Sequence, residues 1–373
     1  MSSRKTGDVM ALVGAQFGSE GKGVIVNKIA DRYGVHVRTG GTNAGHTFKH
    51  KGQKVVMQTI PCGWTNPNAF VVIGAGGLVE IGLLMKEIEL VKSIDPTILD
   101  RLIIDTECGV ISEENMREEG GVHGEMHQRM GSTGKGVGAA RRDRMMRDPK
   151  NFSRMGDLLR SGTTSPTGLM GSDSLPFDFP RHIIQPNTAE FIEQQRRMGT
   201  SILLEGTQGA GLSLIHGYYP YVTSADTNAA QMCADAGIAP RNVTQTMLVA
   251  RTFPIRVAGN SGTMFEEMTW EDISARVGYD VVERTTVTKK VRRIGNWDEP
   301  LMSKAVLLNN PTSIAITFMD YLSPEDTNKS EYGELSQRSR GFVEYVETKW
   351  GAPVALLGTG GDDWTIIDRG LAL

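Results

Sequence analysis

Two glycine-rich segments near the N-terminus, each directly after a short apolar run, constrain the fold most. Val9 to Val13 leads into Gln16-Phe17-Gly18-Ser19-Glu20-Gly21-Lys22-Gly23, and Val24 to Tyr33 follows at helical spacing. Val35 to Arg38 leads into a second such segment, Gly40 to Thr47. A strand, a glycine-rich loop and a helix in this order are typical of α/β proteins that bind phosphate at a helix N-terminus. We therefore predict an α/β fold with a phosphate loop at residues 16–23.

Further apolar runs extend this pattern. A helix is expected over Glu80 to Lys92, and strands are expected at Phe70 to Ile73, Leu102 to Ile104, Ser201 to Leu204, Gln245 to Ala250 and Ser313 to Thr317. Short β-branched runs of this kind predict a mostly parallel central sheet covered by helices, in a single domain over residues 1–373. Residues 112–180 are rich in Gly, Arg, Met and Ser and show little periodicity. We expect them to be a loop-rich insertion that carries binding loops and some helix.

Charge and composition exclude several classes of partner. Forty basic against forty-three acidic side chains give a formal net charge of -3, so neither a nucleic acid nor a membrane is a predicted partner. The apolar runs are too short to span a bilayer, and no signal-peptide segment opens the sequence. We expect a cytoplasmic protein. Cys62, Cys108 and Cys233 lie far apart, which indicates neither a disulfide framework nor a zinc site.

The phosphate loop differs from a Walker A loop, because Gly23 stands where a hydroxyl residue should follow Lys22. Alone, such a glycine-rich turn is also compatible with a purely structural role. The second loop adds the amide of Asn43, the carbonyl of Gly45, the imidazole of His46 and the hydroxyl of Thr47. A histidine in a glycine loop beside a phosphate loop is suited to acid or electrostatic work.

These residues resemble those of the adenylosuccinate synthetase family. Gly18-x-Glu20-Gly21-Lys22-Gly23 followed by Asn43-Ala44-Gly45-His46-Thr47 is similar to the family's paired motifs. The resemblance continues to the end of the chain through Gly131 to Gly138, Glu205 to Gly209, Tyr219 to Ser224, Arg292 to Gly295 and Thr359-Gly360. It implies a fold related to P-loop GTPases and a Mg²⁺-dependent ligase. Such a ligase passes the γ-phosphoryl group of a triphosphate to a purine O6, and the amine of L-aspartate then displaces it.

The resemblance also implies roles for single residues. Lys22 would hold the transferring phosphoryl group, His46 would donate to the oxyanion at O6, and Ser19 occupies the place of the family's general base. Ser19 and the Gly45 carbonyl would be Mg²⁺ ligands. The implied triphosphate site comprises Gly18, Ser19, Glu20, Gly21, Lys22, Gly23, Val24, Gly45, His46, Thr47, Arg292, Phe318, Asp320, Gly358, Thr359 and Gly360.

Two further sites follow from the same resemblance. The implied monophosphate site comprises Ser19, Asn43, Ala44, Thr133, Arg147, Gln208, Thr223 and Lys290. The implied aspartate site comprises Thr286, Val287, Thr288, Lys289, Val291 and Arg292. Arg147 matches an arginine that reaches the site from the other subunit, which implies a homodimer.

Departures from the family pattern point to the substrate. The family has an aspartate as general base where this chain has Ser19, and a smaller, neutral side chain leaves room for a 2-amino group beside N1 of the purine. This matches the phage aminodeoxyadenylosuccinate synthetase branch, which joins dGMP to L-aspartate on the way to 2-aminoadenine DNA. In the family's Thr-Lys-x-Asp motif Phe318 replaces the lysine that grips GTP, so ATP or dATP is the predicted phosphate donor. Lys290 replaces an arginine and keeps only its charge.

Rival interpretations stay open at this level. They are an ordinary adenylosuccinate synthetase that uses IMP and GTP, and a nucleotide-binding relic without turnover. A GTPase switch is disfavoured by Gly23 after Lys22 and by the uncharged Phe318. His123 and His127 are four residues apart, but only Glu125 offers an acidic ligand nearby, so we interpret them as a solvated pair.

Overall fold

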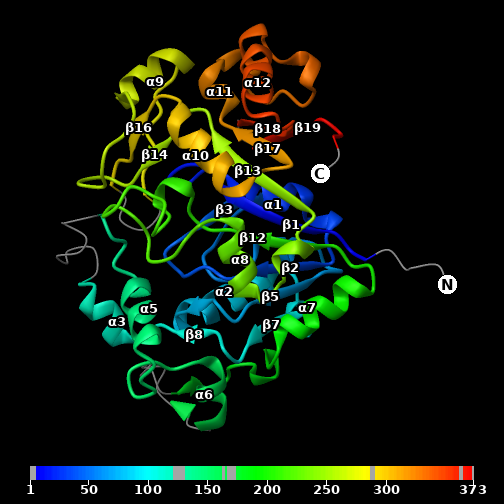
Figure 1. Ribbon diagram of the computed structural model, residues 1–373, viewed down its shortest axis with the longest axis vertical. Coiled ribbons are helices and arrows are strands. Elements are labelled where there is room, and N and C mark those ends of the chain that lie inside the picture. The colour runs from blue at the N-terminus through cyan, green and yellow to red at the C-terminus, as the bar shows by residue number, and fades with distance from the viewer. Residues whose placement is uncertain are drawn as a thin grey trace.

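A ten-stranded sheet forms the centre of the protein in the computed structural model (Figure 1), which describes residues 6–120, 131–161, 164–165, 174–285, 290–360 and 364–371. The strand order is β11-β7-β5-β2-β12-β1-β13-β17-β18-β19, and every pair is parallel except β18 with β19. The predicted mostly parallel sheet is confirmed. The strands are β1 (Val9–Gly14), β2 (Val35–Arg38), β5 (Phe70–Ile73), β7 (Leu102–Asp105), β11 (Ile184–Gln185), β12 (Ile202–Glu205), β13 (Gln245–Arg251), β17 (Ser313–Thr317), β18 (Val354–Gly360) and β19 (Thr365–Asp368).

Helices cover both faces of this sheet. In β1, Met10 and Leu12 pack into one core cluster while Val9 and Val13 pack into another. Because neighbouring side chains of a strand point to opposite faces, β1 is buried on both sides. The first cluster includes residues of α1 (Lys22–Ile29) and α2 (Ile81–Ile94), and the second those of α7 (Thr188–Arg197), α8 (Ala229–Ala236), α10 (Glu299–Asn309) and α12 (Gln337–Trp350).

A smaller antiparallel sheet packs beside the ends of β13 and β17 (Figure 1). It consists of β14 (Ile255–Arg256), β16 (Arg293–Gly295) and β15 (Glu267–Met268), covered by α9 (Trp270–Val277). The short helix α11 (Met319–Leu322) follows β17 and joins this cluster through Tyr321. The region brings residues around 255, 293 and 320 to the same edge as the phosphate loop.

The helix expected over Val24 to Tyr33 is confirmed as α1, which continues as a 3-10 turn over Ala30–Arg32 before the chain becomes extended at Tyr33. One local prediction was wrong. His46 and Thr47 were expected in a loop but open β3 (His46–His50), which pairs with β4 (Gln53–Met57). The two residues that join these strands, Lys51 and Gly52, both have positive φ, as a tight hairpin requires.

Residues 112–180 contain three helices in their described part. These are α3 (Glu113–Glu118), α5 (Val137–Met146) and α6 (Met155–Ser161). Short strand pairs are formed by β9 (Thr164–Ser165) with β10 (Leu175–Pro176), and by β6 (Leu78–Val79) with β8 (Gly109–Val110). His123, Glu125 and His127 lie outside the described residues. In the described part of the chain, none of the helices has the length and apolarity to cross a membrane.

Candidate active site

A cleft of about 480 Å³ lies where the parallel strands end. Ligands of open α/β sheets bind at this edge. The structure brings twelve of the sequence-predicted residues into its wall, namely Gly18, Ser19, Lys22, Asn43, Ala44, Gly45, His46, Thr133, Gln208, Thr223, Lys290 and Arg292. Segments more than 270 residues apart in the sequence therefore meet in one site.

A buried carboxylate holds the phosphate loop from inside. Oε1 of Glu20 accepts hydrogen bonds from the backbone N–H groups of Gln16 at 3.1 Å and Gly18 at 2.8 Å. Oε2 accepts one from Nζ of Lys22 at 2.5 Å, and Lys22 also donates to the Gln208 carbonyl at 2.5 Å. The side chain of Glu20 thus shapes the loop and does not line the cleft, whereas Lys22 lies in its wall.

Ser19 is the exposed residue of this loop. Its backbone φ of 58° lies in the left-handed region, which side-chain-bearing residues seldom adopt. The Ser19 carbonyl accepts a hydrogen bond from Nη1 of Arg251 at 3.3 Å. Ser19 lines the cleft together with His46, so residue 19 belongs to the wall of the predicted substrate site.

His46 is held by a buried carboxylate at the end of β12. Its Nδ1 lies 2.5 Å from Oε1 of Glu205, which also accepts from Nη1 of Arg38 at 2.9 Å, and the N–H of Cys62 donates to Oε2 at 2.7 Å. Glu205 and Arg38 are register partners on β12 and β2. Gly23 permits the approach of β3, because a Cβ there would lie 2.9 Å from that of His46.

Opposing effects set the charges in this cluster. Burial would raise the pKa of Glu205, but its hydrogen bond and attraction to His46, with the Arg38 charge, lower that pKa to about 2. Burial, reinforced by Arg38, lowers the pKa of His46 to about 4. The ring is therefore neutral near pH 7 and donates its Nδ1 proton to Glu205. Nε2 of His46 has no hydrogen-bond partner among the described residues.

The cluster is a positioned histidine and not a metal centre. Ligand atoms of His46, Cys62 and Glu205 lie within 4.8 Å of one another. However, Arg38 and the Cys62 N–H already occupy the carboxylate oxygens of Glu205, and burial raises the pKa of the Cys62 thiol well above its usual range. A thiol that stays protonated is a poor metal ligand.

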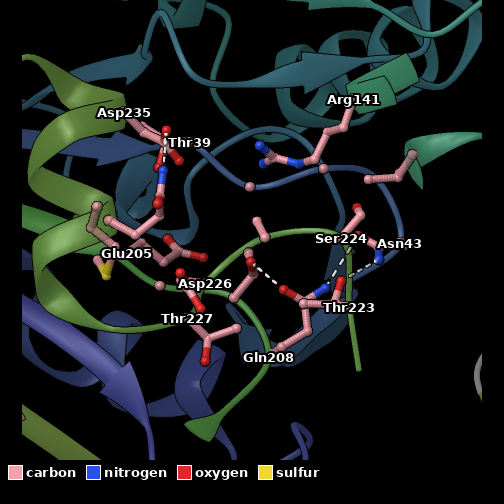
Figure 2. A pocket seen from close by; sticks show the side chains of 18 residues that line it. Thr39, Asn43, Arg141, Glu205, Gln208, Thr223, Ser224, Asp226, Thr227 and Asp235 are labelled. Atoms are coloured by element: carbon pink, nitrogen blue, oxygen red, sulfur yellow. Dashed lines mark hydrogen bonds between the residues drawn. The ribbon is translucent and has the colours of Figure 1, made fainter. Parts of the chain in front are cut away.

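Three residues predicted for the monophosphate site form a hydrogen-bonded row (Figure 2). Nε2 of Gln208 donates to Oδ1 of Asn43 at 3.1 Å, and Nδ2 of Asn43 donates to Oγ1 of Thr223 at 3.4 Å. Oγ1 of Thr207 donates to Oε1 of Gln208 at 2.6 Å. A cavity of about 30 Å³ behind this row is lined by Arg141 and Asp235, among other residues.

The residues implied as Mg²⁺ ligands fit a hard cation. Ser19, which carries a hydroxyl, and Gly45, which has a backbone carbonyl, line the same cleft, and both residues are exposed. Mg²⁺ prefers oxygen ligands and shares its coordination with substrate phosphates and water. Neither ligand is anionic, so the phosphates would have to supply the negative charge.

Other predicted residues lie away from the cleft wall. Gly21, Gly23, Val24 and Thr47 do not line it, and neither does Val291, which is exposed. Phe318 is half-buried beneath the guanidinium of Arg251, which lies 3.7 Å from the centre of the Phe318 ring. Asp320 lies in α11 after β17, and Gly358, Thr359 and Gly360 are the last three residues of β18. Arg147 ends α5 on the surface. Thr286, Val287, Thr288 and Lys289 lie outside the described residues.

Sequence reasoning assigned no role to three residues that organise the site. Arg38, Glu205 and Arg251 each occupy the last position of a buried, largely apolar strand. A charged residue is rarely buried without a partner. A charged residue at the carboxyl end of an apolar run is therefore a feature of the sequence that could have identified these three residues as part of the site.

The chain is similar in sequence to the adenylosuccinate synthetase family and to archaeal members of it. It matches the model of the family described as adenylosuccinate synthetase over residues 11–166 and 181–329. It is 35% identical over 360 residues to adenylosuccinate synthetase of Methanococcus maripaludis strain C6, covering 96% of this chain and 98% of the relative. It is 35% identical over 361 residues to that of Methanocaldococcus jannaschii, with coverages of 96% and 95%.

Two solved structures share the fold. The fully ligated adenylosuccinate synthetase from Plasmodium falciparum superposes with a TM-score of 0.83 at 22% identity, covering 97% of this chain and 100% of the other. The succinoaminodeoxyadenylate synthetase of cyanophage S-2L, bound to dGMP and to dATP as an energy donor, superposes with a TM-score of 0.78 at 23% identity, with coverages of 98% and 96%.

Proposed function

This chain belongs to the adenylosuccinate synthetase family of ligases, which form a C–N bond, and on that premise we propose that its nucleotide substrate is dGMP. The family joins a purine nucleotide to aspartate with a nucleoside triphosphate and Mg²⁺, and its members are typically dimeric. We propose that dGMP, L-aspartate and ATP or dATP give 2-amino-2′-deoxy-N6-succinyladenylate, the diphosphate and phosphate. This product would serve 2-aminoadenine DNA synthesis, in the host cytoplasm if the chain is phage-encoded.

The exposed Ser19 in the cleft wall is the observation that carries this proposal. A carboxylate at this position would crowd the 2-amino group of guanine, whereas a hydroxyl is smaller and both donates and accepts hydrogen bonds. The phosphate loop cannot easily move away from the substrate. Glu20 accepts hydrogen bonds from its backbone N–H groups, and Arg251 donates one to the Ser19 carbonyl. The identity of residue 19 thus decides which purine fits.

The other cleft residues supply the chemistry of the two proposed steps. In the first, the N1 proton of the purine passes to solvent, the O6–P bond forms, and the bond from the γ-phosphorus to the bridging oxygen breaks. The nucleoside diphosphate is the leaving group, and Lys22 lies beside the transferring oxygens. His46 donates through Nε2 to the charge at O6. In the protein alone the ring is neutral and its proton lies on Nδ1, so donation from Nε2 requires that His46 first take up a proton. The negative charge of the bound phosphates and the Glu205 carboxylate, 2.5 Å away, would favour that uptake. Bound Mg²⁺ would neutralise phosphate charge.

In the second step the aspartate amine forms the C6–N bond and phosphate leaves. Lys290 and Arg292 offer positive charge to carboxylates in the cleft wall. Arg147 is exposed and does not line the cleft of its own chain, which supports a role across a dimer interface. Mixing an Arg147→Ala subunit with a Lys22→Ala subunit should then restore activity, and no recovery after proven subunit exchange would refute the role.

Two observations support adenine nucleotides as donors. Phe318 offers a ring edge and no positive charge where the family motif has lysine, and Arg251 already covers one of its faces. The cyanophage protein of this fold is bound to dGMP and dATP, so the fold accommodates that pair of nucleotides.

The direct test is phosphate release from ATP, dATP and GTP, each with Mg²⁺, aspartate and one of dGMP, GMP or IMP, followed by mass analysis of the product. We expect a succinylated 2-aminopurine deoxynucleotide. Turnover with IMP above that with dGMP would overturn the proposal. Nucleotide binding without phosphate release under any combination would instead identify a catalytically inactive relic.

An ordinary adenylosuccinate synthetase that uses IMP and GTP is the second candidate. The names of the archaeal relatives at 35% identity favour it, as does the retained acidic residue of the guanine-reading motif, Asp320. The same assay separates the two candidates.

A further inference from the structure

A buried arginine binds the part of the chain that presents Lys290 and Arg292 to the cleft. Arg251, the last residue of β13, is fully buried. Its guanidinium forms a two-pronged ion pair with Glu283, in which Nη2 donates to Oε1 at 2.6 Å and Nη1 donates to Oε2 at 3.2 Å. The hydroxyl of Tyr321 also donates to Oε1, at 3.4 Å. A bidentate arginine–carboxylate pair fixes the orientation of both side chains, so Glu283 has a defined place beside β13.

The same arginine binds the phosphate loop. Nη1 of Arg251 donates to the Ser19 carbonyl at 3.3 Å, and its backbone N–H donates to Oε1 of Gln16 at 3.0 Å. Nε2 of Gln16 donates to the Arg251 carbonyl at 3.0 Å. The guanidinium lies 3.7 Å from the centre of the Phe318 ring, which covers one of its faces. The hydrogen bonds of one residue therefore reach both the phosphate loop and Glu283.

Glu283 stands at the base of two short, antiparallel segments beside the cleft. The backbone N–H of Arg292 donates to the Glu283 carbonyl at 2.9 Å, and that of Thr285 donates to the Lys290 carbonyl at 2.9 Å. Thr285, Lys290 and Arg292 line the cleft. A shift of Glu283 would therefore move the backbone that carries both cationic side chains.

The charge of Glu283 adds to this arrangement. Burial lowers the pKa of the Arg292 guanidinium, the nearby charge of Glu283 opposes that effect, and the charge of Arg251 reinforces it. Glu283 thus offsets the repulsion between two arginines while it forms an ion pair with one of them. Loss of its charge would leave the buried Arg251 without its carboxylate and strengthen its repulsion of Arg292.

We propose that Arg251 and Glu283 are positioning residues that hold Lys290 and Arg292 in a fixed place relative to the phosphate loop. Neither residue of the pair lines the cleft, so both act through the groups they bind. A triphosphate that restrains the loop also restrains the ion pair, and aspartate then meets cationic groups that are already in place. By thermodynamic linkage, aspartate tightens triphosphate binding by the same factor. This inference rests on the proposed function, in which Lys290 and Arg292 attract the carboxylates of aspartate.

The test is the coupling factor between aspartate and the triphosphate. It is the Kd of a β,γ-imido triphosphate without aspartate divided by its Kd with saturating aspartate, both at saturating Mg²⁺ and monophosphate. We expect a factor of about 5- to 150-fold in the wild type. Glu283→Gln keeps the size of the side chain and removes its charge, so its factor should be at least about threefold smaller. A wild-type factor of one, or the same factor in both proteins, overturns the proposal.

Glu267→Gln is the matched control. Oε1 and Oε2 of Glu267 accept hydrogen bonds from Nε and Nη2 of Arg293, each at 2.6 Å. This second two-pronged pair lies next to Arg292 in the chain, but within the described part of the protein neither of its residues bonds to the phosphate loop. Glu267→Gln should keep the wild-type coupling factor. A decrease equal to that of Glu283→Gln would mean that any disturbance of this region weakens the coupling, and would refute the assignment.

Steady-state kinetics separate positioning from general stability. Arg251→Lys keeps the positive charge and loses the two-pronged geometry, so KM for aspartate should rise about 3- to 10-fold while KM for the monophosphate changes by less than about twofold. Equal changes in both KM values would contradict a positioning role toward aspartate. If Arg251→Lys does not fold, the comparison of Glu283→Gln with Glu267→Gln decides alone.

The donor and monophosphate in these experiments are those that the enzyme turns over fastest. A failure of the dGMP proposal is then seen in the identity of the product, whereas a failure of the positioning role is seen in the coupling factor.

Discussion

Two buried carboxyl groups, Glu205 in the last position of β12 and Asp320 in the short helix α11 that follows β17, have opposite electrostatic properties. Both are almost inaccessible, at 1% and 4% exposure. Burial favours the neutral form of each, yet the pKa of Glu205 is lowered to about 2 while that of Asp320 is raised to about 7. Partners make the difference, because Glu205 binds His46, Arg38 and the Cys62 N–H, whereas one oxygen of Asp320 has no partner in the described residues.

The two ends of the site therefore differ in how far they are preorganised. The Glu205 end is complete without substrate, because its hydrogen bonds already fix the ring of His46. The Asp320 end is incomplete, because Oδ1 of Asp320 has no hydrogen-bond partner among the described residues.

Removing the ring that Glu205 holds should have the largest effect. We expect His46→Ala to lower kcat by on the order of 10³-fold, with a much smaller change in KM for the monophosphate, because the contact is made mainly with charge that develops in the transition state. Steady-state kinetics with varied monophosphate measure both. An equal loss in substrate affinity would mean that His46 contributes only to substrate binding.

Neutralising the carboxylate of Glu205 should destabilise the protein. Glu205→Gln leaves Arg38 buried with its charge unpaired, at a cost of about 3–5 kcal/mol in the free energy of unfolding near pH 7. The folded-state pKa of Glu205 is depressed, so its contribution is present above pH 4.5 and is lost as pH falls toward 2. Denaturant unfolding at pH 7 measures the loss, and a cost below about 1 kcal/mol would contradict the account of this cluster.

The stability that Asp320 contributes should depend on pH in the opposite direction. Its folded-state pKa is raised from 3.8 to about 7, so the stability it contributes is present below pH 4 and is lost as pH rises to 7. Asp320→Asn should therefore become more stable than the wild type as pH rises from 5 to 8, by at most about 4 kcal/mol. Parallel unfolding curves of the two proteins at each pH test this, and a constant difference would mean that Asp320 does not titrate in this range.

A carboxylate introduced at residue 19, in the open cleft, gives a third case to compare with Glu205 and Asp320. We expect Ser19→Asp to lower the ratio of kcat/KM for dGMP to that for IMP by about tenfold, which corresponds to about 1.4 kcal/mol of crowding at the 2-amino group. Hydrogen bonding between that amine and the new carboxylate opposes this effect. An unchanged or higher ratio would show that Ser19 is not the specificity switch.

The sequence predicted most strands of the central sheet but not the carboxylate of Glu205 that holds His46. Short apolar runs located β1, β2, β5, β7, β12, β13 and β17, because both faces of a parallel sheet are buried and leave continuous apolar stretches. The β3–β4 hairpin was missed because its first residues were assigned to a glycine loop. β18 and β19 were also not predicted.

The unpredicted parts of the site depend on contacts between distant segments. His46 and Lys22 stood in recognisable motifs, but the bonding of Glu205 to His46 joins residues 159 positions apart. The stacking of Arg251 on Phe318 likewise depends on neighbouring strands that are distant in sequence. Protonation states such as that of Asp320 follow from burial and partners, which spacing along the chain does not reveal.

Direct competition between monophosphates tests the central claim most closely. Equal concentrations of dGMP and IMP are incubated in one reaction with ATP, Mg²⁺ and limiting aspartate, and the two succinylated products are quantified by mass. Their initial ratio equals the ratio of the two kcat/KM values. We predict that the succinylated 2-aminopurine deoxynucleotide predominates, and a predominance of adenylosuccinate would contradict the assignment of dGMP as the substrate.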